Sequence, residues 1–172
     1  PALTKRLPRN IDVFVDAMGG AGNVAANVVA TSRVLYNEVN PRIFEIVQML
    51  VSEDPVEVIN RVNRLVTDFE LSKANRESYL RLRDDYNRDP TSLKLFTLQI
   101  YAFQNMIRLN GKGAMNTPVG NNSFNEGTAR RISSFVAKTD QFDLICGSYL
   151  RLDPADFPER TVFYFDPPYF IT

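Results

Sequence analysis

An acidic residue, two prolines and a tyrosine follow one another in the sequence as Asp166-Pro167-Pro168-Tyr169. Residues 161–165 just before them are aromatic or β-branched, which predicts a short buried strand. Proline has no N–H for a strand ladder and holds φ near about −65°, so we expect the strand to end in a stiff corner. Ligands of open α/β sheets bind at this edge, beyond the carboxyl ends of the strands.

The chemistry that fits such a corner is the binding of an amino group on a planar base. The Asp166 carboxylate and the Pro167 carbonyl can both accept hydrogen bonds from one –NH2 group. The Tyr169 ring offers a face for stacking, as enzymes that act on a flipped-out nucleobase require. The alternative is a proline turn that only ends a strand, with Tyr169 in the core.

A glycine turn, Gly19-Gly20-Ala21-Gly22, follows the apolar stretch 11–18, which predicts a second buried strand. Residues 24–30 behind the turn predict a helix. A strand, a glycine turn and a helix open nucleotide-binding sheets, where glycine lets the backbone approach a ligand closely. The turn is neither a Walker loop nor a complete GxGxxG, so a purely structural turn is the alternative.

An acidic residue in the next predicted strand extends this pattern. Residues 33–37 predict that strand, and Glu38 follows the glycine turn by about 20 residues, where α/β folds place an acid on ribose hydroxyls. The alternative for Glu38 is a solvated loop acid. Asn40 and Pro41 are the residue types of a helix N-cap and first helical position, so a helix is expected from residue 41.

The middle of the sequence predicts mostly helices. One is expected to begin at Asp54-Pro55, a charged periodic one to cover 73–87, and others to cover 126–137 and the region after Asp89-Pro90. The last of these has an apolar face whose members are spaced three and four apart, which predicts a helix that continues to residue 107. This face consists of Leu93, Phe96, Ile100, Phe103 and Ile107. Residues 142–146 predict a third strand.

Residues 108–125 interrupt every periodicity and are rich in glycine, asparagine and cations, which predicts a long exposed loop. Asparagine can pair with adenine edges, and arginine or lysine with phosphate or guanine. From 99 to 139 the only acidic residue is Glu126, against the basic residues Arg108, Lys112, Arg130, Arg131 and Lys138. This excess suits phosphate contacts, and the alternative is an ordinary solvated face.

Composition limits the possible classes of function. The 172 residues are 44% hydrophobic with a formal net charge of zero, which fits one domain or an incomplete larger one. We expect no membrane span and no secretory leader. The single cysteine, Cys146, cannot form an internal disulfide and favours a cytoplasmic setting. Without histidine, a zinc site and the Ser-His and Cys-His triads are not expected, and no metal is predicted.

Taken in order, these motifs resemble the Dam-like family of DNA adenine-N6 methyltransferases, the alpha group with a DPPY motif. The matching segments are 14–22, 36–40, the loop positions Arg108, Asn110, Gly113, Asn116, Pro118 and Gly120, and 166–169. The resemblance implies an α/β fold: a partial Rossmann-like S-adenosylmethionine-dependent methyltransferase sheet with a helical target-recognition insertion. It implies the first part of the cofactor-binding domain at 1–40, the insertion with its DNA-recognition loop at 41–140, and a return to the α/β domain at 141–172. The chain is expected to be a fragment of the family's full length.

The resemblance also implies roles for individual residues. The adenine amine and the flipped base would be bound by Asp166, Pro167 and Tyr169. The cofactor S-adenosyl-L-methionine would be bound by Asp16, Gly20, Gly22, Glu38 and Tyr149, the last of which follows Gly147-Ser148 where the family often has Gly-Asp-Phe. Double-stranded DNA would be bound by Arg108, Asn110, Lys112, Asn116, Pro118, Arg130 and Arg131.

The expected activity is methyl transfer from S-adenosyl-L-methionine to the N6 amine of adenine in a specific DNA sequence, with the adenine flipped into the corner at 166–169. The expected setting is a bacterial or phage-infected cell, in a restriction–modification system that has a cognate restriction endonuclease. The alternatives are a catalytically incomplete DNA-binding fragment and an amino-methyltransferase that acts on cytosine N4 or on RNA.

Overall fold

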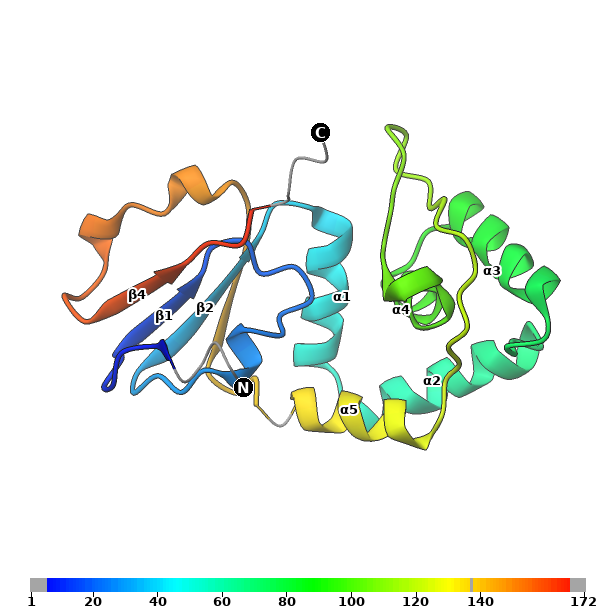
Figure 1. Cartoon of the computed structure of the whole chain (residues 1–172), viewed down its shortest axis with the longest axis horizontal. Coiled ribbons are helices and arrows are strands. Elements are labelled where there is room, and N and C mark those ends of the chain that lie inside the picture. Colours follow the sequence, from blue (N-terminus) through cyan, green and yellow to red (C-terminus); the bar gives the residue numbers. More distant parts are fainter. Residues whose placement is uncertain (1–5, 137, 168–172) are drawn as a thin grey trace. The chain divides into compact units, whose positions relative to one another are not determined.

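The computed structural model describes residues 6–136 and 138–167 (Figure 1). Pro168 and Tyr169, which belong to the predicted corner, lie outside the described residues. The chain divides into two compact units. The first, here called the sheet unit, is Pro1–Val51 with Phe135–Thr172, and the second, the helical unit, is Ser52–Ser134.

Four parallel strands form the sheet unit in the order β3-β2-β1-β4. The strands are β1 (Val13–Asp16), β2 (Arg33–Glu38), β3 (Phe142–Cys146) and β4 (Thr161–Tyr164). The register places Asp16 at the end of β1 between Tyr36 of β2 and Tyr164 of β4. This order matches the first four strands of a Rossmann-like sheet, so the predicted α/β class is confirmed.

Both faces of the sheet are covered by the sheet unit itself. On one face, Val47 of α1 (Pro41–Ser52) packs with Phe14 and Tyr36. On the other face, Val15 and Leu35 pack with Phe157, from the segment between β3 and β4 that carries the 3-10 turns η4 (Tyr149–Arg151) and η5 (Pro154–Asp156). The Asn40 side chain accepts the Arg42 N–H at 3.0 Å, which confirms the expected start of α1.

The helix expected at 24–30 is only a 3-10 turn, η2 (Ala25–Asn27), so this prediction was wrong. Val28 is already extended, and the Thr31 N–H bonds to the Ile11 carbonyl at 2.8 Å. The chain is therefore drawn into β2 before a second helical turn can form. The β-branched residues of this stretch, Val24, Val28 and Val29, also have a low helix propensity.

The helical unit contains three complete helices and most of a fourth. They are α2 (Pro55–Asp68), α3 (Arg76–Arg88), α4 (Ser92–Tyr101) and α5 (Glu126–Val136), which ends in the sheet unit. Asp54 caps α2 by accepting the Val56 and Glu57 N–H groups, as the sequence predicted. In the part of the chain that the structure describes, no helix has the length and apolar character needed to cross a bilayer.

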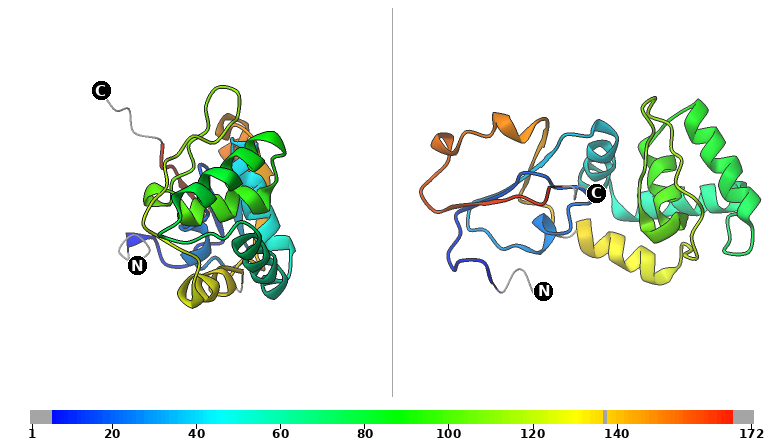
Figure 2. Two further views of the ribbon diagram at one scale, coloured as in Figure 1. Left: turned by 90° about the vertical axis from the view of Figure 1, so that its right-hand side faces the viewer. Right: turned by 45° about the horizontal axis from the view of Figure 1, so that its top comes forward.

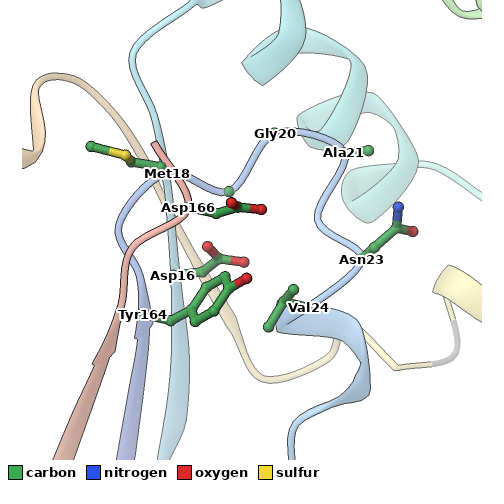
Figure 3. Close-up of a pocket in the computed structure, with 9 residues that line it drawn as sticks. Asp16, Met18, Gly20, Ala21, Asn23, Val24, Tyr164 and Asp166 are labelled. Carbon is green, nitrogen blue, oxygen red and sulfur yellow. The ribbon is translucent and has the colours of Figure 1, made fainter. Parts of the chain in front are cut away.

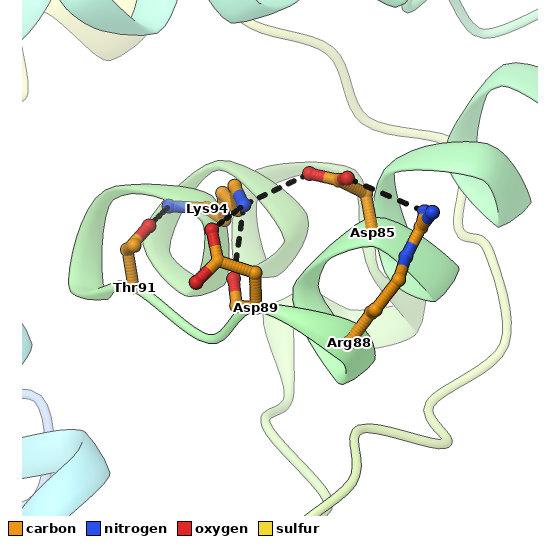
Figure 4. Close-up of polar contacts among 5 residues, drawn as sticks. All are labelled: Asp85, Arg88, Asp89, Thr91 and Lys94. Carbon is orange, nitrogen blue, oxygen red and sulfur yellow. Dashed lines mark hydrogen bonds and ion pairs between the residues drawn. The ribbon is translucent and has the colours of Figure 1, made fainter.

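The corner between α3 and α4 is held by one lysine (Figure 4). The Lys94 ammonium lies 2.9 Å from carboxylate oxygens of both Asp85 and Asp89, and it also donates to the Asp89 carbonyl. Burial opposes the charge on Lys94, but the hydrogen bonds that Lys94 donates to the two carboxylates outweigh this effect, so the pKa of Lys94 is raised. The ammonium therefore stays charged and ties the end of α3 to the start of α4.

The helix expected to continue to residue 107 ends at Tyr101, which corrects that prediction. Ala102 is extended and pairs with Val119. The Tyr101 carbonyl and the Phe103 N–H, which a longer helix would need for its own hydrogen bonds, instead bond to residues 118–120. A short turn, η3 (Phe103–Asn105), follows. The connection from α4 to α5 runs without helix through most of its length (Figure 2).

Candidate active site

A cavity of about 260 Å³ lies at the carboxyl ends of β1 and β4, beside the glycine turn (Figure 3). It brings together two of the groups that the sequence singled out, the glycine turn and the acid of the 166–169 corner, which lie far apart along the chain. The lining residues are Asp16, Met18, Gly19, Gly20, Ala21, Asn23, Val24, Tyr164 and Asp166.

Asp16 is the most deeply buried acid of this cavity, with 1% of its surface exposed. Its Oδ2 accepts the Ala25 N–H at 3.3 Å. Its Oδ1 is buried and has no hydrogen-bond partner among the described residues. Because an unsatisfied buried carboxylate oxygen is costly, this atom is an acceptor suited to a donor on a ligand.

The environment of Asp16 raises its pKa to about 6. Burial is the main cause, and the negative charges of Asp166 and Glu38 add to it, while the N–H groups of Ala25 and Met18 act in the opposite direction. Asp16 is therefore mostly ionised at neutral pH. A cation in the cavity would offset both the cost of burying this charge and its repulsion by Asp166 and Glu38.

Glu38 is buried beside the glycine turn, which excludes the alternative of a solvated loop acid. Its Oε2 accepts the Gly20 N–H at 2.9 Å, and its Oε1 accepts the Asn40 N–H at 2.7 Å. Gly20 and Gly22 have φ angles of 51° and 71°, in the left-handed region that favours glycine. Each carboxylate oxygen can accept a further bond, so Glu38 can hold both the turn and a ligand hydroxyl.

Three of the predicted cofactor-binding residues are not among those that line the cavity: Gly22, Glu38 and Tyr149. Gly22 does not line the cavity, and a Cβ there would lie 3.1 Å from the Phe135 ring. Tyr149 also lies outside the lining and is 41% exposed, with its ring edge-on to Phe165 at 5.8 Å. Asp166 lines the cavity, and both it and Pro167 are exposed, whereas Tyr169 is outside the described residues.

The sequence interpretation missed Tyr36 and Gly19. Tyr36 is completely buried, and its hydroxyl donates to the Gly20 carbonyl at 2.6 Å. Gly19 leaves the space that the Tyr36 ring occupies. The available signal was the alternation in β2, which places Tyr36 and Glu38 on the same face of the sheet.

In the helical unit, residues 108–117 fold back on themselves as a short hairpin. Leu109 pairs with Met115, and the Asn110 Oδ1 accepts the N–H groups of Lys112 and Ala114. The Asn110 side chain thus holds the turn, in addition to any role toward DNA. Across the hairpin, the Arg108 Nε donates to the Asn116 Oδ1 at 2.7 Å.

Two residues of α3 anchor this hairpin, and neither was predicted to do so. The Asn87 amide bonds to the Met115 N–H at 2.7 Å and to the Met115 carbonyl at 3.1 Å. The Tyr79 hydroxyl donates to the Thr117 carbonyl at 2.9 Å. The predicted exposed loop therefore has a fixed base with buried backbone.

The remaining predicted DNA-binding residues of the helical unit are exposed. Lys112 lies at the turn of the hairpin, and Pro118 follows its second arm. On α5, the Arg130 guanidinium lies 3.8 Å from Glu126, and Arg131 donates to the Thr128 hydroxyl. Within residues 6–136 and 138–167, no cluster of three or more acidic, cysteine or histidine side chains is arranged to hold a metal ion.

A family model described as "D12 class N6 adenine-specific DNA methyltransferase" matches residues 1–172. The chain is 46% identical over 173 residues to "Modification methylase LlaI" of Lactococcus lactis subsp. lactis, and this match covers 100% of the chain and 28% of the relative. It is 31% identical over 169 residues to "Modification methylase StsI" of Streptococcus sanguinis, and this match covers 96% of the chain and 26% of the relative. It is 28% identical over 160 residues to "DNA adenine methylase" of Vibrio cholerae, and this match covers 91% of the chain and 56% of the relative.

The chain thus spans little more than a quarter of the length of the two modification methylases. The family match nevertheless extends over all 172 residues and includes both strands that border the cavity. The parallel sheet and the cavity at its carboxyl edge agree with that match. This chain belongs to the family of D12 class N6 adenine-specific DNA methyltransferases.

Proposed function

We propose that this chain carries the cofactor-binding and base-binding residues of an enzyme that transfers a methyl group from S-adenosyl-L-methionine to the N6 amine of adenine in double-stranded DNA. The observation that carries the proposal is the pair of carboxylates on one cavity: the buried Asp16, with its unpartnered Oδ1, and Asp166. Family membership supports the reaction class.

The donor set fits the cofactor. When bound, S-adenosyl-L-methionine supplies a methyl group on a positively charged sulfur, and its methionine part carries an ammonium group. The Asp16 Oδ1 is an acceptor for that ammonium group, and Glu38 is an acceptor for the ribose hydroxyls. The cavity of about 260 Å³ is slightly smaller than the ~300–1,000 Å³ of pockets that enclose a whole ligand, so it suits one part of the cofactor.

The base-binding role belongs to Asp166 and Pro167, with Tyr169 proposed from the sequence for stacking. The exposed Asp166 carboxylate and the Pro167 carbonyl can accept the two N–H groups of an adenine amine. Two acceptors draw the nitrogen lone pair out of the ring and make the nitrogen more nucleophilic. Orientation and electrostatics then lower the barrier, and no covalent enzyme intermediate is needed.

The helical unit is proposed to bind the DNA. Its exposed cations, Lys112, Arg130 and Arg131, suit phosphate contacts, and the anchored hairpin offers a rigid base for them. A cognate restriction endonuclease is proposed as a functional partner because two relatives are named modification methylases.

The first test is calorimetric titration of the chain with S-adenosyl-L-methionine. We expect saturable binding by the unmodified chain and its loss in Asp16→Ala. The matched control is Asp68→Ala, which removes an exposed acid of α2 far from the cavity in sequence and should leave the affinity unchanged. Equal affinity of all three proteins would exclude Asp16 as a cofactor ligand.

The second test separates the possible activities. Labelled cofactor and unmethylated DNA are incubated with the protein, and the product nucleoside is identified. N6-methyladenine is the expected product. N4-methylcytosine, or methylation of RNA alone, would assign the cavity to a different amino group, and salt-sensitive DNA binding without any methylated product would indicate a non-catalytic DNA-binding protein.

A further inference from the structure

The Tyr36 ring of β2 packs so closely against the glycine turn that position 19 has no room for a side chain. A Cβ added to Gly19 would lie 2.2 Å from the Tyr36 Cε2 and 2.4 Å from its Cδ2. Real Cβ atoms do not approach other atoms so closely, and the Tyr36 ring is fully buried and has no room to retreat. A tyrosine at position 36 therefore requires glycine at position 19.

The polar ends of Tyr36 and Glu38 hold Gly20 from both sides. The Tyr36 hydroxyl donates to the Gly20 carbonyl at 2.6 Å, and the Glu38 Oε2 accepts the Gly20 N–H at 2.9 Å. Tyr36 and Glu38 lie on the same face of β2, because alternate residues of a strand share a face. Gly20 is thereby fixed in its left-handed conformation, with φ at 51°.

Two further contacts complete the support of the turn. The Gly19 N–H donates to the Asn37 carbonyl at 2.8 Å, and the Gly22 N–H donates to the Gly19 carbonyl at 2.8 Å. Burial raises the pKa of Tyr36 above its ordinary value of 10.0, and the charges of Glu38, Asp16 and Cys146 add to this effect. The Tyr36 hydroxyl therefore keeps its proton at neutral pH and can donate its hydrogen bond to the Gly20 carbonyl.

We propose that Tyr36 is a positioning residue of the candidate active site, whose ring and hydroxyl fix the glycine turn in the conformation that admits the cofactor. Tyr36 is not among the residues that line the cavity, so it acts through Gly19 and Gly20, which are. The identity of the ligand rests on the proposed function, whereas the support of the turn by Tyr36 does not.

The expected effect on binding follows from the population of the fixed turn. If the loss of one hydrogen bond lets the turn leave its binding conformation, only the molecules that keep this conformation can bind. The apparent affinity is then the intrinsic affinity multiplied by the fraction of molecules in the binding conformation. The net contribution of one buried hydrogen bond to stability corresponds to a decrease in affinity of about three- to tenfold.

The test compares Tyr36→Phe with Tyr79→Phe, because the chain offers a matched pair of tyrosines. Each is almost fully buried, and each donates its hydroxyl to a backbone carbonyl, Tyr36 to Gly20 and Tyr79 to Thr117. Only Tyr36 contacts the glycine turn. The measurements are amide hydrogen exchange of residues 19–22 in the ligand-free chain, and titration with S-adenosyl-L-methionine.

We expect Tyr36→Phe to accelerate exchange at residues 19–22 and to weaken binding by about three- to tenfold. Tyr79→Phe should lower the unfolding temperature to a comparable extent while leaving both measurements unchanged. Unchanged exchange and affinity in Tyr36→Phe would overturn the proposal. If the unmodified chain did not bind the cofactor at all, the proposed function would fail, yet the exchange rates would still decide whether Tyr36 positions the turn.

A double-mutant cycle tests the contact between the ring and Gly19. Gly19→Ala in the unmodified background should accelerate exchange in the turn and weaken binding, because the new Cβ meets the Tyr36 ring. In a Tyr36→Leu background the same change should have a much smaller additional effect, since the ring edge is gone. Strictly additive effects would show that the two residues act independently and would contradict the proposal.

Discussion

The Asp16 and Asp166 carboxylates face one cavity from the ends of two neighbouring parallel strands, β1 and β4. The negative charge of Asp166 contributes to the raised pKa of Asp16. We therefore expect Asp166→Asn to lower the pKa of Asp16 below about 6, without returning it to the ordinary 3.8, because burial is the larger cause. Carboxyl-carbon NMR titration of both proteins would measure the change, and an identical pKa in the two would show that the charges do not interact.

Cofactor binding should depend on pH through Asp16. Its carboxylate is the form that attracts an ammonium group, and it predominates above a pH of about 6. Affinity for S-adenosyl-L-methionine should therefore be full at pH 8 and fall by about tenfold per pH unit once the pH is well below 6. Titrations at pH 5.0, 6.0 and 8.0 would measure this, with Asp16→Asn as the control that should be weak and independent of pH.

Asp16 should also destabilise the ligand-free protein. Because its pKa in the folded chain is about 6 rather than 3.8, the folded state holds a proton that the unfolded state has released between these values. Stability is thus lost as the pH rises from 3.8 to about 6, and the penalty remains above that. Asp16→Asn should raise the free energy of unfolding by about 1–3 kcal/mol at pH 8 and by little at pH 4.

Urea unfolding at the two pH values would test this prediction. The same stabilisation at both pH values would mean that packing, and not ionisation, distinguishes the variant. Since Asp16→Asn should also weaken cofactor binding, a variant that is more stable but binds more weakly would show that the Asp16 carboxylate serves binding at the expense of the free energy of unfolding.

The sequence predicted those features whose cause is local. The start of α2 follows from the Asp54 cap and Pro55, and the start of α1 from Asn40 and Pro41. The end of α4 could not be read this way: the apolar spacing continues to residue 107, whereas Ala102 pairs with the distant Val119. Tertiary hydrogen bonding overrides helical periodicity there.

The candidate site shows the same division. Asp16, Gly20 and Asp166 were chosen by residue type and by the strand ends on which they lie, and the structure places all three on one cavity. Gly22, Glu38 and Tyr149 were chosen in the same way but do not line it. Tyr36 was missed because its role depends on the packing of its ring against Gly19, which no spacing in the sequence reveals. The roles proposed for all of these residues remain predictions.

The Asn87 amide should control the order of the hairpin in the helical unit. It bonds both to the N–H and to the carbonyl of the buried Met115, so Asn87→Ala leaves two backbone groups without their partner. We expect a loss of about 1–3 kcal/mol in local stability, seen as faster amide exchange at Met115, and weaker DNA binding. Asn121→Ala, which truncates an exposed side chain of the same unit, is the control. Unchanged exchange at Met115 would show that the hairpin is ordered without the Asn87 amide.

Two glycines of the connection between α4 and α5 should respond oppositely to alanine. A Cβ at Gly120 would lie 2.6 Å from the Ala102 carbonyl oxygen, so Gly120→Ala must push apart the paired backbones and should cost about 1–3 kcal/mol. At Gly111 a Cβ would meet nothing within 4 Å, and Gly111→Ala should be neutral or stabilise by about 0.4–1 kcal/mol. Thermal unfolding of both variants would decide, and equal destabilisation would contradict the close approach at Gly120.

The strand order has a consequence for how the protein folds. β1 and β2 are near neighbours along the chain and can pair early, together with the glycine turn between them, whereas β4 must find β1 across most of the sequence. Such a long closure is slow, because chain entropy is lost before the contacts form. We therefore expect β1, β2 and the glycine turn to form the Asp16 side of the cavity before β4 brings Asp166 to it. On this order of pairing, the cavity is completed only when β4 has paired with β1, which joins two segments that lie far apart in the sequence.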